Sequence, residues 1–98
     1  MTFAVKLTEF AISDLIELRN WIAEQADETI ATAYLERIQA RIRTLSHFPD
    51  RGQDRSEIRP GIRSLAFERN KIILYHIKGD TVWVQRVVSG KRDMSALF

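Results

Sequence analysis

Apolar and polar positions alternate at the start of the chain, where Phe3, Val5 and Leu7 are separated by an alanine and a lysine. A period of two residues is typical of a half-buried strand. Thr8 then offers a hydroxyl that can cap a helix, and Glu9 places a favourable negative charge in its first turn. The opening residues therefore predict a short strand followed at once by a helix.

The next apolar positions recur at spacings of four, three and four residues, as one face of a helix requires, at Ala11, Leu15, Leu18 and Ile22. This stripe predicts a helix that runs to about Ala26. Three more apolar residues make the stripe wider than a single seam needs: Ile12, Ile16 and Trp21. The solvated face is expected to carry Ser13, Asp14, Glu17 and Asn20.

A second helix is predicted after Asp27, which can cap it, with apolar residues again spaced by four and three, at Ala31, Leu35, Ile38, Ile42 and Leu45. The connection to the first helix is only a few residues long, so the two should form an antiparallel helical hairpin. Pro49 should end the second helix, because proline disfavours the helical conformation in the residue before it.

A polar connection with proline and glycine follows, and then three strands are predicted at Ile62–Glu68, Lys71–Lys78 and Thr81–Val88. The short turns between them favour an antiparallel meander. Both faces of the second of these strands are apolar, which places it centrally in the sheet. The expected fold is α+β and two-layered, in the order β-α-α-β-β-β, with the hairpin on one face of a four-stranded, mostly antiparallel sheet and the N-terminal strand at an edge.

Length and composition limit the classes of protein. Ninety-eight residues indicate a single domain, 1–98, and 45% apolar with 29% charged residues are typical of a globular protein. The absence of cysteine excludes disulfides and thiolate metal sites. No apolar run of 18 residues and no signal-peptide pattern are present, so a cytoplasmic protein without a membrane partner is expected.

Charge is unevenly distributed along the chain. Residues 1–49 carry five Lys/Arg against seven Asp/Glu, whereas residues 50–98 carry ten against six, which gives −2 and +4. This asymmetry favours an acidic partner or a target associated with nucleic acid for the second half. Direct DNA binding is not expected, because the chain has no recognition-helix pattern.

Four segments together resemble the ParE branch of the RelE/ParE toxin superfamily, and the resemblance covers essentially the whole chain. They are D-L-I-E-L-R-N-W-I-A at 14–23, F-P-D-R-G-Q-D-R-S-E-I-R-P-G-I-R at 48–63, K-I-I-L-Y-H-I at 71–77 and R-V-V-S-G-K-R-D at 86–93. The resemblance implies the toxin of a type II toxin–antitoxin module. ParE-like toxins inhibit DNA gyrase and block replication, whereas RelE-like relatives with the same fold are ribosome-dependent mRNA endoribonucleases. It also implies a hetero-oligomer with a cognate antitoxin, commonly a ribbon-helix-helix DNA-binding protein whose C-terminal segment wraps the toxin.

A nuclease would need a base, a proton donor and cations for the phosphate. Arg63 and Arg86 suit the phosphate, and His76 is the candidate base. Ser89, however, stands where many members of the superfamily have a histidine, and serine does not titrate near neutrality. The residues therefore favour a non-catalytic toxin, with the endoribonuclease as the alternative. A binding module without toxicity is a third possibility.

Two candidate surfaces follow from these considerations, and no cofactor or metal site is predicted. The expected target-binding residues are cations of the second half: Arg59, Arg63, Arg86, Lys91 and Arg92. The expected antitoxin-binding residues would line an apolar groove along the helical hairpin: Ile12, Ile16, Trp21 and Tyr34.

Overall fold

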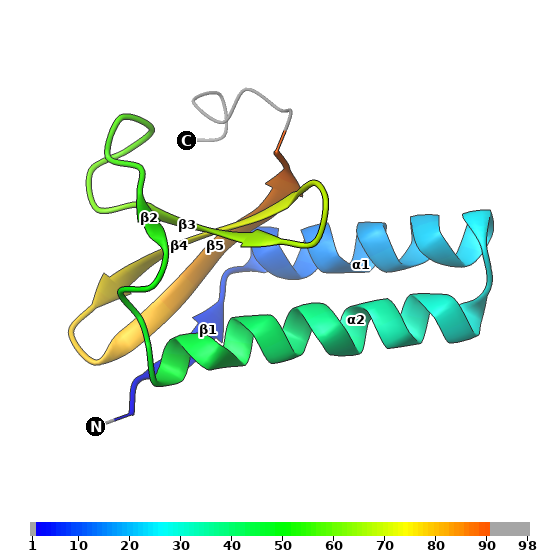
Figure 1. The fold of residues 1–98 in the computed structure, drawn as a ribbon, viewed down its shortest axis with the longest axis horizontal. Coiled ribbons are helices and arrows are strands. Elements are labelled where there is room, and N and C mark those ends of the chain that lie inside the picture. Colours follow the sequence, from blue (N-terminus) through cyan, green and yellow to red (C-terminus); the bar gives the residue numbers. More distant parts are fainter. Residues whose placement is uncertain (1, 91–98) are drawn as a thin grey trace.

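Two helices pack against one face of a five-stranded sheet in the computed structural model, which describes residues 2–90 (Figure 1). The elements in chain order are β1 (Ala4–Leu7), α1 (Glu9–Gln25), α2 (Glu28–Arg43), the 3₁₀ turn η1 (Thr44–Ser46), β2 (Gln53–Asp54), β3 (Arg63–Phe67), β4 (Lys71–Lys78) and β5 (Thr81–Ser89). The predicted α+β class and two-layer arrangement are confirmed.

The sheet has the strand order β1-β5-β4-β3-β2. Strand β1 lies at one edge and runs parallel to β5, and every other pair is antiparallel. The edge position predicted for the N-terminal strand is therefore correct. The expected count of four strands is wrong, because Gln53–Asp54 pair with Arg63 and Ser64 and add β2 at the other edge. Two polar residues carry no alternating pattern, so this strand is defined only by its partner.

Both helix starts are capped as the sequence predicts. The Thr8 hydroxyl accepts a hydrogen bond from the backbone N–H of Ala11 at 3.1 Å, and the Asp27 carboxylate accepts one from that of Ile30 at 2.8 Å. The helices form the predicted antiparallel hairpin, and the turn that joins them lies beyond the end of the sheet where β3 turns into β4 (Figure 1). The last apolar residue of the second stripe, Leu45, belongs to η1 rather than to α2.

The main core lies between the helices and the sheet. It is formed by Ala11 and Leu15 of α1, Ile38 and Ile42 of α2, Leu45, and the inward side chains of β3, β4 and β5. A smaller core lies on the opposite face, where Ile62 and Ile58 of the long loop pack over Leu74, Val88 and Ile72. The loop thus covers part of the sheet face that the helices leave open.

The strand ends differ slightly from the predicted ones, because β3 begins at Arg63 and ends at Phe67. Glu68 has a φ of 50° and starts the turn to β4. Between β4 and β5 the register shifts at Leu74/Tyr75, so that Leu74 pairs with Arg86 and Tyr75 pairs with Val84. This bulge leaves Gln85 as the extra residue of β5.

Candidate functional site

Arg86 is held by α1 rather than presented to solvent. Its Nε donates to Asp14 Oδ2 at 2.7 Å and its Nη2 donates to Asp14 Oδ1 at 2.9 Å, while the backbone N–H of Val87 also donates to Asp14 Oδ2 at 2.9 Å. The two side chains are only 18% and 11% exposed. The hydrogen bond to Asp14 raises the pKa of Arg86. A bidentate guanidinium–carboxylate pair of this kind links α1 to β5.

The expectation that Asp14 lies on the solvated face of α1 is wrong. Its carboxylate points from the flank of α1 onto the end of β5, where three N–H groups surround it. The sequence contains one sign of this, since Asp14 lies next to Leu15 and three residues after Ala11, at the border of the apolar stripe. Its partner is 72 residues away in the chain, and nothing local identifies it.

Arg63 likewise contacts its own chain. Its Nη1 donates to the carbonyl oxygens of Gly52 at 3.0 Å and Asp50 at 3.3 Å. The Tyr75 hydroxyl holds the same segment, because it donates to the carbonyl of Pro49 at 2.7 Å and accepts the Gly52 N–H at 2.9 Å. Tyr75 is fully buried, and burial raises the pKa of its hydroxyl. Tyr75 is therefore a core residue whose hydroxyl is tethered by two hydrogen bonds to the loop.

His76 lies on the other face of the sheet, beside a cavity of about 140 Å³ lined by Arg59, Pro60, Ile62, His76 and Gln85. Its Nδ1 is 2.7 Å from the amide Nε2 of Gln85. An amide nitrogen only donates, so this contact favours the neutral imidazole with its proton on Nε2. Burial lowers the pKa of His76, and the charges of Arg59 and Lys78 lower it further.

The three residues of the nuclease alternative are therefore not brought together. Arg86 points toward α1, Arg63 toward residues 50–52 and His76 toward the open face of the sheet. Of the expected target-binding residues, Arg59 is exposed and lines the cavity with His76. Lys91 and Arg92 lie outside the residues that the structure describes.

The three expected antitoxin-binding residues on α1 occupy two flanks of the helix rather than one groove. Ile12 and Ile16 line a groove of about 230 Å³ between the helices, together with Leu7, Leu15, Arg19, Leu35 and Gln39. Trp21 is 59% exposed but lines a separate groove of about 510 Å³, with Asp14, Glu17, Leu18, Asn70, Lys71 and Val87–Ser89. Residues nine positions apart on a helix point about 180° from each other, which separates Ile12 from Trp21.

Tyr34 is half-buried and packs edge-on against Phe67, with ring centroids 5.4 Å apart and an interplanar angle of 88°. The Arg37 guanidinium lies 5.4 Å from the Tyr34 ring and pairs with Glu68 at 2.7 Å. Tyr34 therefore connects α2 to the turn after β3 and lies away from the groove of Ile12 and Ile16. The structure gives Tyr34 a packing role.

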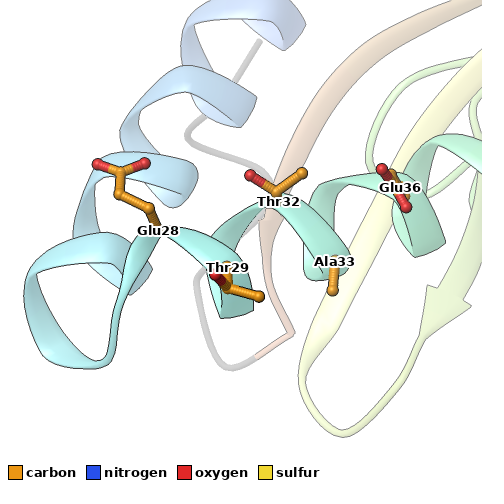
Figure 2. A pocket seen from close by; sticks show the side chains of 5 residues that line it. All are labelled: Glu28, Thr29, Thr32, Ala33 and Glu36. Carbon is orange, nitrogen blue, oxygen red and sulfur yellow. The ribbon is translucent and has the colours of Figure 1, made fainter.

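A shallow depression of about 380 Å³ lies along α2 and is lined by Glu28, Thr29, Thr32, Ala33 and Glu36 (Figure 2). All five side chains come from one helix, and the expected cationic residues are not among them. Glu28 pairs with Arg19 at 2.5 Å.

Within residues 2–90, no group of three or more histidine, aspartate or glutamate side chains could hold a metal ion. None of the helices in this part of the chain is long and apolar enough to cross a membrane.

One row of side chains was missed by the sequence interpretation. Trp83 lies between the fully buried Val82 and Val84, so its own side chain points to the opposite face of the sheet. Its strand neighbours are Lys6 on β1 and His76 on β4, and the Lys6 Nζ lies 5.7 Å from the centroid of the Trp83 ring. The alternation in β5 indicates the outward position of Trp83. Only the strand order shows which residues stand beside it.

Comparison with known proteins gives a consistent result. Residues 5–94 match the family described as the ParE toxin of the type II toxin–antitoxin system, parDE. Toxin ParE3 of Caulobacter vibrioides is 32% identical over 83 residues, which cover 85% of this chain and 82% of that protein.

Two solved structures share the fold. The chromosomal ParDE toxin–antitoxin system from P. aeruginosa aligns with a TM-score of 0.80 at 21% identity, over 90% of this chain and 96% of that one. The toxin–antitoxin complex RelBE2 from Mycobacterium tuberculosis aligns with a TM-score of 0.59 at 24% identity, over 91% and 92% of the two chains.

Proposed function

Because the chain belongs to the ParE toxin family of type II toxin–antitoxin systems, we propose that it acts by binding and inhibiting DNA gyrase, without catalysing a reaction of its own. Members of this family are gyrase inhibitors that are neutralised by a cognate antitoxin. Gyrase acts on the chromosome, so the proposed place of action is the cytoplasm.

The observation that carries the non-catalytic proposal is the pairing of Arg86 with Asp14. RNA cleavage needs a cation that can reach the scissile phosphate. In Arg86, however, Nε and Nη2 already bind the carboxylate of Asp14. His76 lines a cavity with residues of the long loop, and Arg63 binds the carbonyl groups of residues 50 and 52, so neither shares a partner with Arg86. The ribosome-dependent endoribonuclease remains the alternative, and it has less support.

Among the expected target-binding cations, we assign direct contact to Arg59, with Lys91 and Arg92 proposed alongside it. Arg59 is exposed on the long loop. Arg63 and Arg86 are proposed to act indirectly, because they hold the loop and the end of β5 in position.

The antitoxin is proposed to place apolar side chains of an amphipathic segment in the groove that contains Ile12 and Ile16. These residues are 46% and 54% exposed, and Leu35 and Leu7 extend the apolar lining. Trp21 is proposed as a second contact on the other flank of α1, which requires a segment long enough to pass around the helix. Following the family, the antitoxin is proposed to carry a ribbon-helix-helix DNA-binding part.

A supercoiling assay tests the gyrase proposal. Purified toxin is titrated into DNA gyrase with relaxed plasmid and ATP, and we expect loss of supercoiling together with stabilised DNA breaks. Addition of the antitoxin encoded beside the toxin gene should restore supercoiling. Unchanged supercoiling, together with cuts in translated messages after induction of the toxin, would establish the endoribonuclease instead.

The antitoxin groove is tested by Ile16→Glu, which places a charge among apolar side chains. We expect the antitoxin dissociation constant to rise by about ten-fold or more, the effect typical of a central interface residue. Ile30→Glu is the matched control, because Ile30 is 51% exposed on α2 and does not line the groove. Equal effects of both substitutions, measured by titration calorimetry, would place the antitoxin elsewhere.

A further inference from the structure

A row of three side chains crosses the open face of the sheet on three adjacent strands. Lys6 of β1 pairs in register with Trp83 of β5, and Trp83 pairs with His76 of β4. The neighbours of each along its own strand pack into or against the helix-side core, among them Leu7, Val82 and Tyr75. Because side chains alternate along a strand, the three members of the row point away from the helices.

The long loop covers the other half of this face. Ile58 and Ile62 pack over Leu74 and Val88 and close that part of the sheet. The row lies nearer the turn between β4 and β5, where Lys78 pairs with Thr81. Trp83, the central member of the row, is partly exposed. The sheet therefore offers one bounded polar and aromatic surface on the layer opposite the helices.

The side chains of the row are held in place before any partner arrives. Lys6 Nζ lies 5.7 Å from the Trp83 ring centroid, and Gln85 Nε2 holds His76 Nδ1 at 2.7 Å. Both β1 and β4 are hydrogen-bonded to β5, so the backbone positions are fixed as well. Preorganised aromatic and cationic residues lose little conformational entropy on binding and are frequent at the centres of protein interfaces.

The charge of this surface indicates the chemistry of the partner. Lys6 belongs to the row, Lys78 follows His76 by two residues on β4, and Arg59 lines the cavity next to His76. Asp80, in the turn between β4 and β5, directly precedes β5 in the sequence, and its carboxylate accepts a hydrogen bond from the Thr81 hydroxyl. A few cations beside the row, of which Lys6 contacts the Trp83 ring, suit a few carboxylates on a protein surface rather than the long run of phosphates along a DNA duplex.

From this arrangement we propose that the toxin binds gyrase through the row of Lys6, Trp83 and His76, which receives an acidic patch of the gyrase protein surface. The inference rests on the proposed function, since it takes gyrase as the target. It assigns target and antitoxin to opposite layers of the molecule, because the groove of Ile12 and Ile16 lies on the helices. Gyrase and the antitoxin would then contact different residues.

Two substitutions test the row in the supercoiling assay with purified DNA gyrase. Trp83→Ala removes the central ring, and we expect the toxin concentration for half-inhibition to rise about thirty-fold, the factor of an interface hot spot. Lys6→Glu reverses a charge at an exposed position and should raise it about ten-fold. Arg69→Glu is the matched control: it makes the same charge change in the exposed turn at the other end of β4 and should leave the inhibition unchanged.

Further measurements separate the possible outcomes. Antitoxin binding by each variant, measured by calorimetry, should match the wild type, and urea denaturation shows separately that the fold is intact. If the wild-type toxin inhibits gyrase and Lys6→Glu and Trp83→Ala inhibit it equally well, the row is not the gyrase-binding surface, but the proposed function still stands. No inhibition by the wild type would overturn the proposed function and the row with it. Loss of antitoxin binding in parallel, or toxin binding to plasmid alone that weakens in the variants, would assign the row to the antitoxin or to DNA and would also overturn the proposal.

Discussion

At the scale of single residues, polar side chains that look available in the sequence are used within the fold. The Tyr75 hydroxyl forms hydrogen bonds with the backbone of Pro49 and Gly52, and the Arg63 guanidinium donates one to the Gly52 carbonyl. Gly52 has no space for a side chain, because an added Cβ would meet the Tyr75 hydroxyl and would lie 2.8 Å from the Ser64 carbonyl oxygen. The start of the long loop is therefore positioned by buried hydrogen bonds and close packing.

Tyr75→Phe tests this anchor. The substitution leaves the Gly52 N–H and the Pro49 carbonyl without their buried partner, so we expect the free energy of unfolding to fall by about 1–3 kcal/mol. Urea denaturation measures the change. Tyr34→Phe is the control and should alter stability by less than about 0.5 kcal/mol, because Tyr34 contributes ring contacts rather than a buried hydroxyl bond within the described residues. A smaller loss for Tyr75→Phe than for Tyr34→Phe would contradict the anchor.

His76 predicts a dependence of stability on pH. Burial and the charges of Arg59 and Lys78 hold its pKa below that of the unfolded chain, so the unfolded state takes up the proton first as the pH falls. The stability that neutral His76 contributes is fully present above the pKa of histidine in the unfolded chain, about 6.5. It is lost as the pH decreases below that value. Melting temperatures between pH 7 and pH 5 should fall more steeply for the wild type than for His76→Gln. A steeper fall in the variant would show that His76 is stabilised in its charged form.

At the scale of elements, the contact between α1 and β5 determines how the two layers are joined at the end of the sheet. Asp14 collects two guanidinium bonds and one backbone bond from residues 86 and 87. The Thr8 hydroxyl adds a bond from the start of α1 to the Gln85 carbonyl at 2.8 Å. Residues 85–87 of β5, which include the bulge, are therefore held by α1 as well as by the neighbouring strand.

Removal of one member of the Asp14–Arg86 pair should lower the free energy of unfolding substantially. Asp14→Ala leaves a largely buried guanidinium without its carboxylate, and we expect a loss of about 3 kcal/mol in the free energy of unfolding. The double variant Asp14→Ala, Arg86→Met should recover part of that loss, because it leaves no buried charge. Glu28→Ala is the comparison: its pair with Arg19 is 70% and 42% exposed, and such pairs contribute about 0–1 kcal/mol. Equal losses for the two pairs in chemical denaturation would argue against a special role of the α1–β5 contact.

At the scale of the whole molecule, the two layers present different chemistry. The helix layer offers an apolar groove that contains Ile12 and Ile16, whereas the groove that contains Trp21 lies between α1 and the sheet and is partly polar. The open sheet face offers an aromatic residue with Lys6 against its ring. The C-terminal half supplies most of the positive charge, but the fold brings Lys6 of β1 beside it through the parallel pairing with β5. The basic surface is therefore assembled from both ends of the chain.

Separate surfaces should give independent effects. In a variant that combines Ile16→Glu with Trp83→Ala, the factor lost in antitoxin affinity should equal that of Ile16→Glu alone, and the factor lost in gyrase inhibition should equal that of Trp83→Ala alone. The two titrations already described measure both factors. Strong coupling between the substitutions in either titration would indicate that one partner contacts both layers.

Much of the fold was predictable from the sequence, because helices and strands depend on residues only a few positions apart. The caps at Thr8 and Asp27, the two helical stripes and the three strands after the loop are local patterns, and all of them appear in the structure. Composition and the four resembling segments predicted the family. Strand β2 escaped prediction because two polar residues become a strand only when β3 lies beside them.

The candidate sites were less predictable, because side-chain partners far apart in sequence are chosen by strand order and helix orientation. Arg86 has the same local sequence whether it faces solvent or Asp14, and only the packing of α1 on β5 decides between these states. Ile12 and Trp21 both widen one apolar stripe in the sequence, yet the sheet and α2 lie so that they open onto different grooves. The sequence by itself determined the elements and the family, since these follow from short-range periodicity and motif order. Tertiary structure alone decided which cations are exposed and which residues form the row across β1, β5 and β4, since strand register brings together residues that no local pattern connects.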